Sequence, residues 1–147
     1  MTRVAPGVVI RRGVEHDLAA VSVIQQSSPE ASQWPVTEYL QYDLRVAEIS
    51  GELAGFLVAR TVAEGEHEVL NLAVAPEYRR RGIARGLLLD LSKETFGDIY
   101  LEVRESNAGA RIFYKSMGFQ EIGSRPSYYK TVTGGVESAI VMKFHSC

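Results

Sequence analysis

The most informative segment of this chain is Asn71–Leu91, with the sequence NLAVAPEYRRRGIARGLLLDL. An apolar run over Val69–Val74 predicts a buried strand, and Pro76 opens a polar turn that extends to Arg81. From Gly82 onward apolar side chains recur at helical spacing, which predicts a helix. A strand therefore leads through a glycine-containing loop into a helix N-terminus, whose free N–H groups and positive dipole end attract an anion.

The sequence of this loop does not match the motifs of two familiar kinds of phosphate-binding site. The chain contains neither the Gly-x-x-x-x-Gly-Lys-Ser/Thr loop of nucleotide hydrolases nor the Gly-x-Gly-x-x-Gly dinucleotide fingerprint. It contains Arg79-x-x-Gly82-x-Ala84, which resembles the Arg/Gln-x-x-Gly-x-Gly/Ala signature of the GCN5-related N-acetyltransferases, the GNAT superfamily. The resemblance implies that backbone amides of residues 80–85 hold the pyrophosphate of acetyl-CoA. The alternative is an arginine-rich surface turn before an ordinary helix.

Length and composition limit the other possibilities. A chain of 147 residues fits one domain over residues 1–147, and 46% hydrophobic with 23% charged residues is typical of a globular protein. The net charge of −2 argues against direct nucleic-acid binding. The single cysteine, Cys147, excludes an internal disulfide and a cysteine metal site, and the three histidines form no metal-binding constellation. Without a transmembrane run or a signal-peptide core, we expect a cytoplasmic protein with no metal and no membrane partner.

The order of predicted elements indicates a mixed α/β (α+β) fold, with a mostly antiparallel central sheet flanked by helices. We predict strands at 8–12, 46–49, 53–59, 69–74, 99–103, 119–123 and 138–144. We predict helices from Leu18 with Asp17 as cap, after Thr37 through Leu44, from Ile83 to Phe96 with Gly97 as stop, and from Asn107 through Met117. The last loop is expected to hold Tyr128-Tyr129.

The second half of the chain indicates which group within the GNAT superfamily this sequence resembles. Leu101-Glu102-Val103-Arg104 is followed in order by Asn107, Tyr114, Met117-Gly118-Phe119 and Tyr128-Tyr129. This series resembles the RimI-like GNAT enzymes, which acetylate the N-terminal alanine of ribosomal protein S18. The resemblance implies the GNAT acyl-CoA N-acyltransferase fold, acetyl-CoA as co-substrate and a protein N-terminus, S18 or a similar peptide, as partner.

The resemblance also implies a role for each candidate residue. Glu102 is the expected general base, through water, and Tyr114 the general acid at the sulfur. A backbone N–H of the 72–74 strand is expected to meet the acetyl carbonyl. The substrate side is expected to include Trp34, Tyr128 and Tyr129. The expected acetyl-CoA contacts are Leu72, Ala73, Val74, Arg80, Arg81, Gly82, Ile83, Ala84, Arg85 and Asn107.

Other interpretations of these residues remain open at this stage. Glu102 could be a solvated strand residue, Tyr114 a core residue and Asn107 a plain helix cap. Within the same chemistry, the acceptor could be a lysine side chain or a small-molecule amine. A non-catalytic acetyl-CoA sensor and an RNA-binding module that uses Arg79–Arg81 are the alternatives from other classes.

Overall fold

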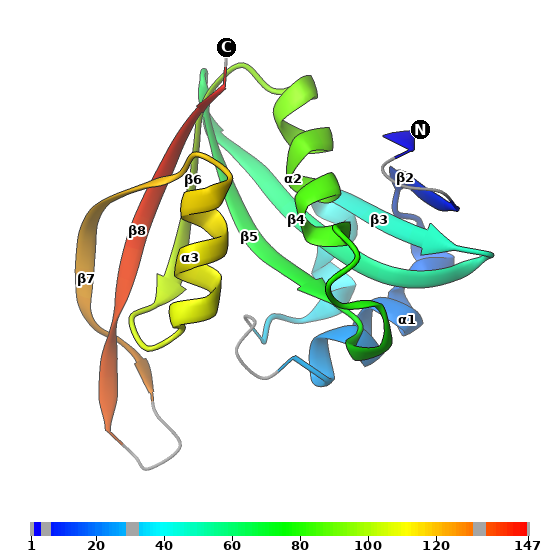
Figure 1. Cartoon of the computed structure of the whole chain (residues 1–147), viewed down its shortest axis with the longest axis horizontal. Helices are drawn as coiled ribbons and strands as arrows, with labels where there is room; N and C mark the ends of the chain where they lie inside the picture. The colour runs from blue at the N-terminus through cyan, green and yellow to red at the C-terminus, as the bar shows by residue number, and fades with distance from the viewer. Residues whose placement is uncertain (1, 4–6, 29–32, 131–134, 147) are drawn as a thin grey trace. The chain divides into compact units, whose positions relative to one another are not determined.

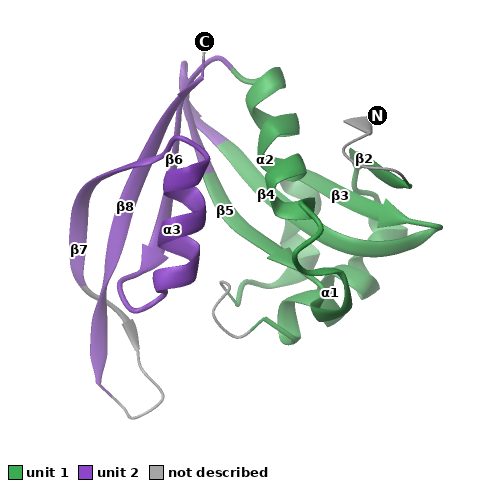
Figure 2. Cartoon of the chain, viewed as in Figure 1, with its two compact units in different colours: residues 1–60, 69–95 green, residues 61–68, 96–147 purple. Residues whose placement is uncertain are grey.

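The computed structural model describes residues 2–3, 7–28, 33–130 and 135–146. The chain divides into two compact units, Met1–Arg60 with Val69–Thr95 and Thr61–Glu68 with Phe96–Cys147 (Figure 2). Each unit combines strands with helices. The pairs β1–β2, β2–β3, β3–β4, β6–β8 and β7–β8 are antiparallel, and β5–β6 is parallel. The mixed fold class with a mostly antiparallel sheet is therefore confirmed.

The first unit is built on the strand order β1-β2-β3-β4-β5 (Figure 1). Ser50 and Gly51, both with positive φ, form the hairpin turn between β3 and β4. Strand β2 has the predicted bounds and β1 was not predicted, while β3, β4 and β5 extend beyond the apolar runs that predict them. The bounds are β1 Thr2–Arg3, β2 Val8–Arg12, β3 Asp43–Ile49, β4 Glu52–Ala63 and β5 Glu66–Val74.

Strand alternation explains how helices cover both faces of this sheet. Val46 and Phe56 point to the face where α1 (Leu18–Gln26) and η2 (Val36–Gln41) pack, in a core that also contains Val21 and Tyr39. The opposite face carries Arg45, Ala47, Gly55 and Leu57, and packs against α2 (Ile83–Glu94). The short η3 (Pro76–Tyr78) precedes α2, and η1 (Glu15–Asp17) precedes α1.

A buried arginine ties α2 to the sheet. The Arg45 side chain on β3 is 3% exposed and forms ion pairs with Asp43 at 2.9 Å, with Asp90 at 2.7 Å and with Glu94. Its guanidinium also donates to the Asp90 carbonyl at 3.1 Å. Because a buried charge is tolerated only when its donors are matched, this cluster fixes how α2 lies on β3.

The same face explains a glycine in β4. A Cβ built on Gly55 would lie 2.9 Å from the Ala73 carbonyl oxygen and 3.1 Å from Ile83 Cγ2. We therefore expect Gly55→Ala to lower the free energy of unfolding by about 1–3 kcal/mol, the usual cost of overpacking. Urea-induced unfolding of the two variants measures this change in the free energy of unfolding. Gly123→Ala, where a Cβ meets nothing within 4 Å, is the control, and equal stability of the two variants would contradict the close approach.

The second unit continues the order as β5-β6-β8-β7, with β6 Gly97–Arg104, β7 Gln120–Lys130 and β8 Val136–Ser146. The start of β5 pairs in parallel with β6, from Glu66 with Asp98 to Glu68 with Tyr100. Helix α3 (Ala108–Ser116) begins after Asn107 and is followed by Gly118, whose φ of +101° is typical of the residue after a helix end. No helix in the described parts of the chain is long and apolar enough to cross a membrane.

Some local predictions were wrong. Asp17 does not cap α1, because its carboxylate accepts from the Val14 N–H at 2.8 Å and pairs with Arg11. The helix predicted after Thr37 is the 3-10 turn η2, and Leu44 belongs to β3.

Two predicted boundaries at the other end of the chain were also wrong. Helix α2 ends at Glu94, and Gly97 begins β6 instead of stopping the helix. Glycine is needed there because its φ is +102° and a Cβ would lie 2.2 Å from the Gly65 carbonyl oxygen. The tyrosines placed in the last loop, Tyr128 and Tyr129, lie in β7, because that strand extends beyond residue 123.

Candidate active site

The loop between β5 and α2 has the backbone geometry of an anion cradle. Gly82 is the N-cap of α2 with φ +76°, and Arg80 also has positive φ. A Cβ built on Gly82 meets no atom within 4 Å, so its exposed face is open space beside the first turn of the helix. The first N–H groups of α2 have no partner within the helix, so they can donate to an anion placed there. The residues thus fit the pyrophosphate of acetyl-CoA.

Arg79 ties this loop to its surroundings. Its Nε donates to the Val74 carbonyl at 3.2 Å, and its Nη2 donates to Ser28 Oγ at 3.3 Å at the end of α1. The Arg81 guanidinium lies 5.5 Å from the centre of the Tyr78 ring, whose hydroxyl donates to Glu52 at 2.8 Å. Arg79 therefore serves as an anchor for the loop, a role that its position in the motif does not by itself reveal.

We expect Gly82→Val to raise the dissociation constant of acetyl-CoA roughly ten- to a hundredfold, since one hydrogen bond to a charged group contributes about 1.5–3 kcal/mol. The new side chain would fill the space through which the anion approaches. Calorimetric titration measures the affinity. Gly7→Val is a matched control because Gly7 has φ +83° and also faces open space. Unchanged affinity in a folded Gly82→Val protein would remove the loop from the site.

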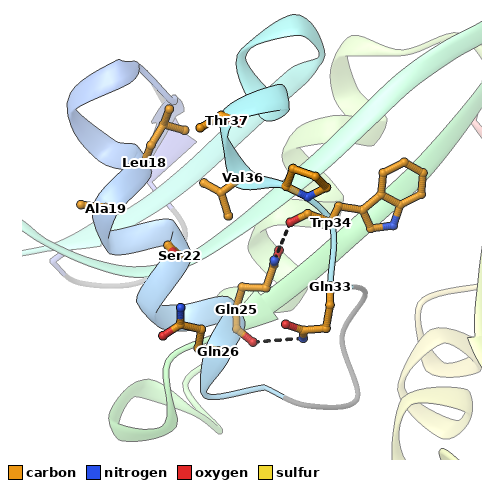
Figure 3. Close-up of a pocket in the computed structure, with 10 residues that line it drawn as sticks. Leu18, Ala19, Ser22, Gln25, Gln26, Gln33, Trp34, Val36 and Thr37 are labelled. Carbon is orange, nitrogen blue, oxygen red and sulfur yellow. Dashed lines mark hydrogen bonds between the residues drawn. The ribbon is translucent and has the colours of Figure 1, made fainter.

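Trp34 precedes η2 in the same unit and is 40% exposed. Its carbonyl accepts from Gln25 Nε2 at 2.8 Å, while its ring projects away from α1 (Figure 3). Residues of α1, of the 33–35 segment and of η2 line an open cavity of about 560 Å³. Its lining includes Ser22, Gln25, Gln33 and Val36.

In the second unit, β6 presents Glu102 on its less buried face, since residues 99, 101 and 103 are buried and alternate with it. The Glu102 side chain is 15% exposed, and its Oε1 lies 2.8 Å from Arg125 Nη2. Burial raises the pKa of the Glu102 carboxyl, the charge of Arg125 opposes that rise and the charge of Glu68 adds to it. A carboxylate with a raised pKa in partial burial is suited to accept a proton.

We expect Arg125→Gln to move the acid limb of the kcat/KM profile to higher pH. The Arg125 charge lowers the pKa of Glu102, so removing it raises that pKa, and the catalytic carboxylate is then lost at a higher pH as the solution is acidified. The activity should fall more at pH 6 than at pH 8. Arg111→Gln, whose partner is Glu121 at 2.9 Å, is the control. An unchanged profile would exclude Glu102 as the titrating base.

Tyr114 and Asn107 are placed by α3. The Asn107 side chain accepts from the Ala110 N–H at 3.1 Å, which confirms it as the helix cap. Tyr114 is partly buried, with its ring 5.6 Å from that of Phe119. The turn before α3 is held by Glu137, which accepts from the Ser106 N–H at 3.0 Å and has a lowered pKa because of that contact. These contacts hold the turn before α3 and the N-terminus of the helix in place.

The expected site residues thus fall into two sets. The first unit contains Trp34, Leu72, Ala73, Val74 and the loop residues Arg80–Arg85, and the second contains Glu102, Asn107, Tyr114, Tyr128 and Tyr129. Tyr129 is paired with Glu137 through β7 and β8, while the side chains of both tyrosines lie outside what the structure describes.

Among the described residues, no group of three or more His, Cys, Asp or Glu side chains could hold a metal. Sequence reasoning assigned no role to Arg125 or to the buried residues behind Trp34, and it placed Arg79 in the motif without predicting its contacts.

Comparison with known proteins decides the family. A model of the acetyltransferase (GNAT) family matches residues 17–119. The chain belongs to the GNAT acetyltransferase family. Members of this family use acetyl-CoA as co-substrate.

This GNAT acetyltransferase is 40% identical over 108 residues to the ribosomal protein bS18-alanine N-acetyltransferase of Escherichia coli K12, which covers 71% of this chain and 70% of that protein. The Haemophilus influenzae protein of the same name is 36% identical over 63% of this chain and 65% of its own length. The crystal structure of the E. coli S18-alanine N-acetyltransferase matches with a TM-score of 0.82, at 32% identity and over 95% of this chain and 94% of that one. The RimI-like resemblance is confirmed.

Proposed function

We propose that this protein transfers the acetyl group of acetyl-CoA directly to the N-terminal α-amine of a protein, with ribosomal protein S18 as the first candidate. The similarity to enzymes named for that reaction, over about 70% of each sequence, carries the proposal. We further propose that residues 1–147 work as one cytoplasmic acetyltransferase domain, since the family match extends over segments of both units.

The loop before α2 binds the coenzyme. Backbone amides of Arg80–Arg85 receive the pyrophosphate, and the open face of Gly82 supports this assignment. A backbone N–H of Leu72–Val74, that of Val74 first, stabilises the carbonyl oxygen of the thioester as it gains negative charge. The side chain of Asn107 contacts the pantetheine arm, in addition to capping α3.

The reaction needs proton transfers at the amine and at the sulfur. Glu102 accepts one proton from the ammonium form of the acceptor through a water molecule, because an ammonium has no lone pair with which to attack. The amine nitrogen then bonds to the carbonyl carbon and the carbon–sulfur bond breaks. Tyr114 donates its phenolic proton to the departing thiolate, and the second proton that the nitrogen releases as it becomes an amide restores the phenol. The raised pKa of Glu102, caused mainly by burial, supports its role as the base.

The acceptor side is assigned to Trp34, Tyr128 and Tyr129. The position of Trp34 at a partly exposed turn leaves its ring accessible to a peptide. Tyrosine hydroxyls can hydrogen-bond a peptide backbone without selecting its side chains.

A substrate panel tests the proposed function. Purified protein is incubated with acetyl-CoA and, in parallel, with an S18 N-terminal peptide, an unrelated alanine-initiated peptide, a lysine peptide with a blocked N-terminus and spermidine. Mass spectrometry then locates the acetyl group. We expect it on the α-amine of the S18 peptide. Faster acetylation of spermidine or of the blocked peptide would replace the proposal by a small-amine or lysine acetyltransferase, and no turnover with any amine would favour a sensor.

A further inference from the structure

A polar cluster lies inside the first unit, behind the segment that carries Trp34. Gln25 of α1, Tyr39 of η2 and Asn71 of β5 are 5%, 1% and 5% exposed. The Tyr39 hydroxyl donates to Gln25 Oε1 at 2.5 Å. Asn71 Nδ2 donates to the same oxygen at 3.0 Å and lies 3.1 Å from the Tyr39 oxygen. Side chains from α1, η2 and β5 thus meet at one buried amide, that of Gln25.

The cluster contacts both the segment assigned to the acceptor and the strand assigned to the acetyl group. Gln25 Nε2 donates to the Trp34 carbonyl at 2.8 Å (Figure 3), and Asn71 Oδ1 accepts from the Leu72 N–H at 3.0 Å. A second contact joins the same parts, since Gln33 Nε2 donates to the Gln25 carbonyl at 3.3 Å. The segment before η2 is therefore hydrogen-bonded, through Gln25, to the strand assigned to the acetyl group.

The chemistry of the amide fixes its orientation. A backbone carbonyl can only accept, so the NH₂ group of Gln25 must face Trp34 and its oxygen must face Tyr39 and Asn71. Tyr39 remains a donor at neutral pH, because burial raises the pKa of its hydroxyl. Every partner in the cluster is thus matched, and only a side chain that donates and accepts can fill the position of Gln25.

We propose that Gln25 and Tyr39 are positioning residues that set the acceptor site by holding the Trp34 segment against β5. The inference rests on the proposed function for what the acceptor is, but the positioning of Trp34 does not. Such positioning acts on peptide binding, whereas the pyrophosphate of acetyl-CoA is assigned to the loop before α2, outside the cluster. A residue that served only the stability of the core would affect both substrates alike.

Fluorescence of Trp34, the only tryptophan in the chain, tests the positioning without any substrate. Gln25→Met keeps the size of the side chain and removes its donor. We expect the acrylamide quenching constant to rise and the emission maximum to move to longer wavelength, because the released segment exposes the ring further. Gln26→Met is the control, since Gln26 is the exposed neighbour on the same helix and lines the same cavity.

Tyr39→Phe is a second variant in case Gln25→Met does not fold. It keeps the ring that lies 5.9 Å from Phe56 and leaves the bond from Gln25 to Trp34 possible. We expect a smaller change of Trp34 quenching in the same direction. Circular dichroism and the thermal midpoint establish that each variant is folded.

Kinetics then test the consequence for the reaction. In Gln25→Met we expect KM for the alanine peptide to rise about two- to tenfold, the factor that one net hydrogen bond is worth. KM for acetyl-CoA and kcat should stay at their wild-type values, as all three parameters should in Gln26→Met. If folded Gln25→Met and Tyr39→Phe quench like Gln26→Met and show unchanged KM for peptide, the inference is overturned.

The two proposals fail separately. If the wild-type protein acetylates a different amine, the proposed function fails, and the quenching comparison still decides whether Gln25 holds Trp34. If the quenching changes as expected but KM for the acceptor does not, Trp34 is held by the cluster and the acceptor site lies elsewhere, which overturns the assigned role.

Discussion

Replacement of Glu102 by glutamine is expected to lower turnover of the alanine peptide by about 10²–10⁴-fold, the usual contribution of general acid–base catalysis. Glutamine keeps the size of the side chain and cannot accept the proton. The loss should be greatest at low pH, where the acceptor amine is mostly protonated and depends on the base. Steady-state rates between pH 6 and 9, with acetyl-CoA affinity measured in parallel, give the result.

The design separates catalysis from structure. Glu102 is ion-paired with Arg125 at 2.8 Å, so its replacement also removes that contact. Glu121→Gln on β7 removes a comparable ion pair with Arg111 of α3 and should leave turnover close to wild type. Arg125→Gln, which removes the pair from the other side, should keep most of the activity at pH 8. If Glu102→Gln matched Glu121→Gln in rate, the carboxylate would have no catalytic role.

Local features of the sequence were sufficient to predict the strand–loop–helix segment around Gly82 and most strands. The apolar run before Pro76, the glycine at position 82 and the helical spacing after it act over a few residues, and the structure has a strand, a turn and a helix there. The Asn107 cap is likewise a contact between near neighbours, with Ala110. The family resemblance then supplied the roles of Glu102 and Tyr114, which no local pattern could provide.

Contacts between distant segments could not be predicted in this way. Glu102 meets Arg125 because both β6 and β7 pair with β8, where Glu102 and Gly123 share the partner Val141. Irregular pairing between Glu121 and Gly123 shifts that register, and the sequence does not reveal it.

The buried cluster shows the same limit. Gln25 and Asn71 are 46 residues apart in sequence, and each alone resembles an ordinary polar residue on an apolar helix or strand. Leu44 was assigned to a helix because its spacing from Leu40 is helical, yet pairing with Val58 places it in β3. Tertiary pairing decided these positions.

The choice of acceptor gives the second large effect. A protein α-amine has a pKa of about 7.7–8.0 and a lysine amine about 10.4, so near neutral pH the α-amine is uncharged roughly several hundred times more often. That ratio corresponds to about 3.5 kcal/mol at about 1.36 kcal/mol per pKa unit. One partly buried carboxylate, Glu102, is suited to the easier deprotonation, whereas a lysine-selective site would need stronger help.

Two peptides of identical sequence test this claim most directly. Both begin with alanine and contain one internal lysine; one has a free N-terminus and an acetylated lysine, and the other an acetylated N-terminus and a free lysine. The measurement is kcat/KM for each at pH 7, with mass spectrometry to locate the new acetyl group. We predict a preference of roughly a hundredfold or more for the free α-amine, from the difference in pKa. Equal values, or faster acetylation of the lysine, would contradict N-terminal acetylation as the function of this protein.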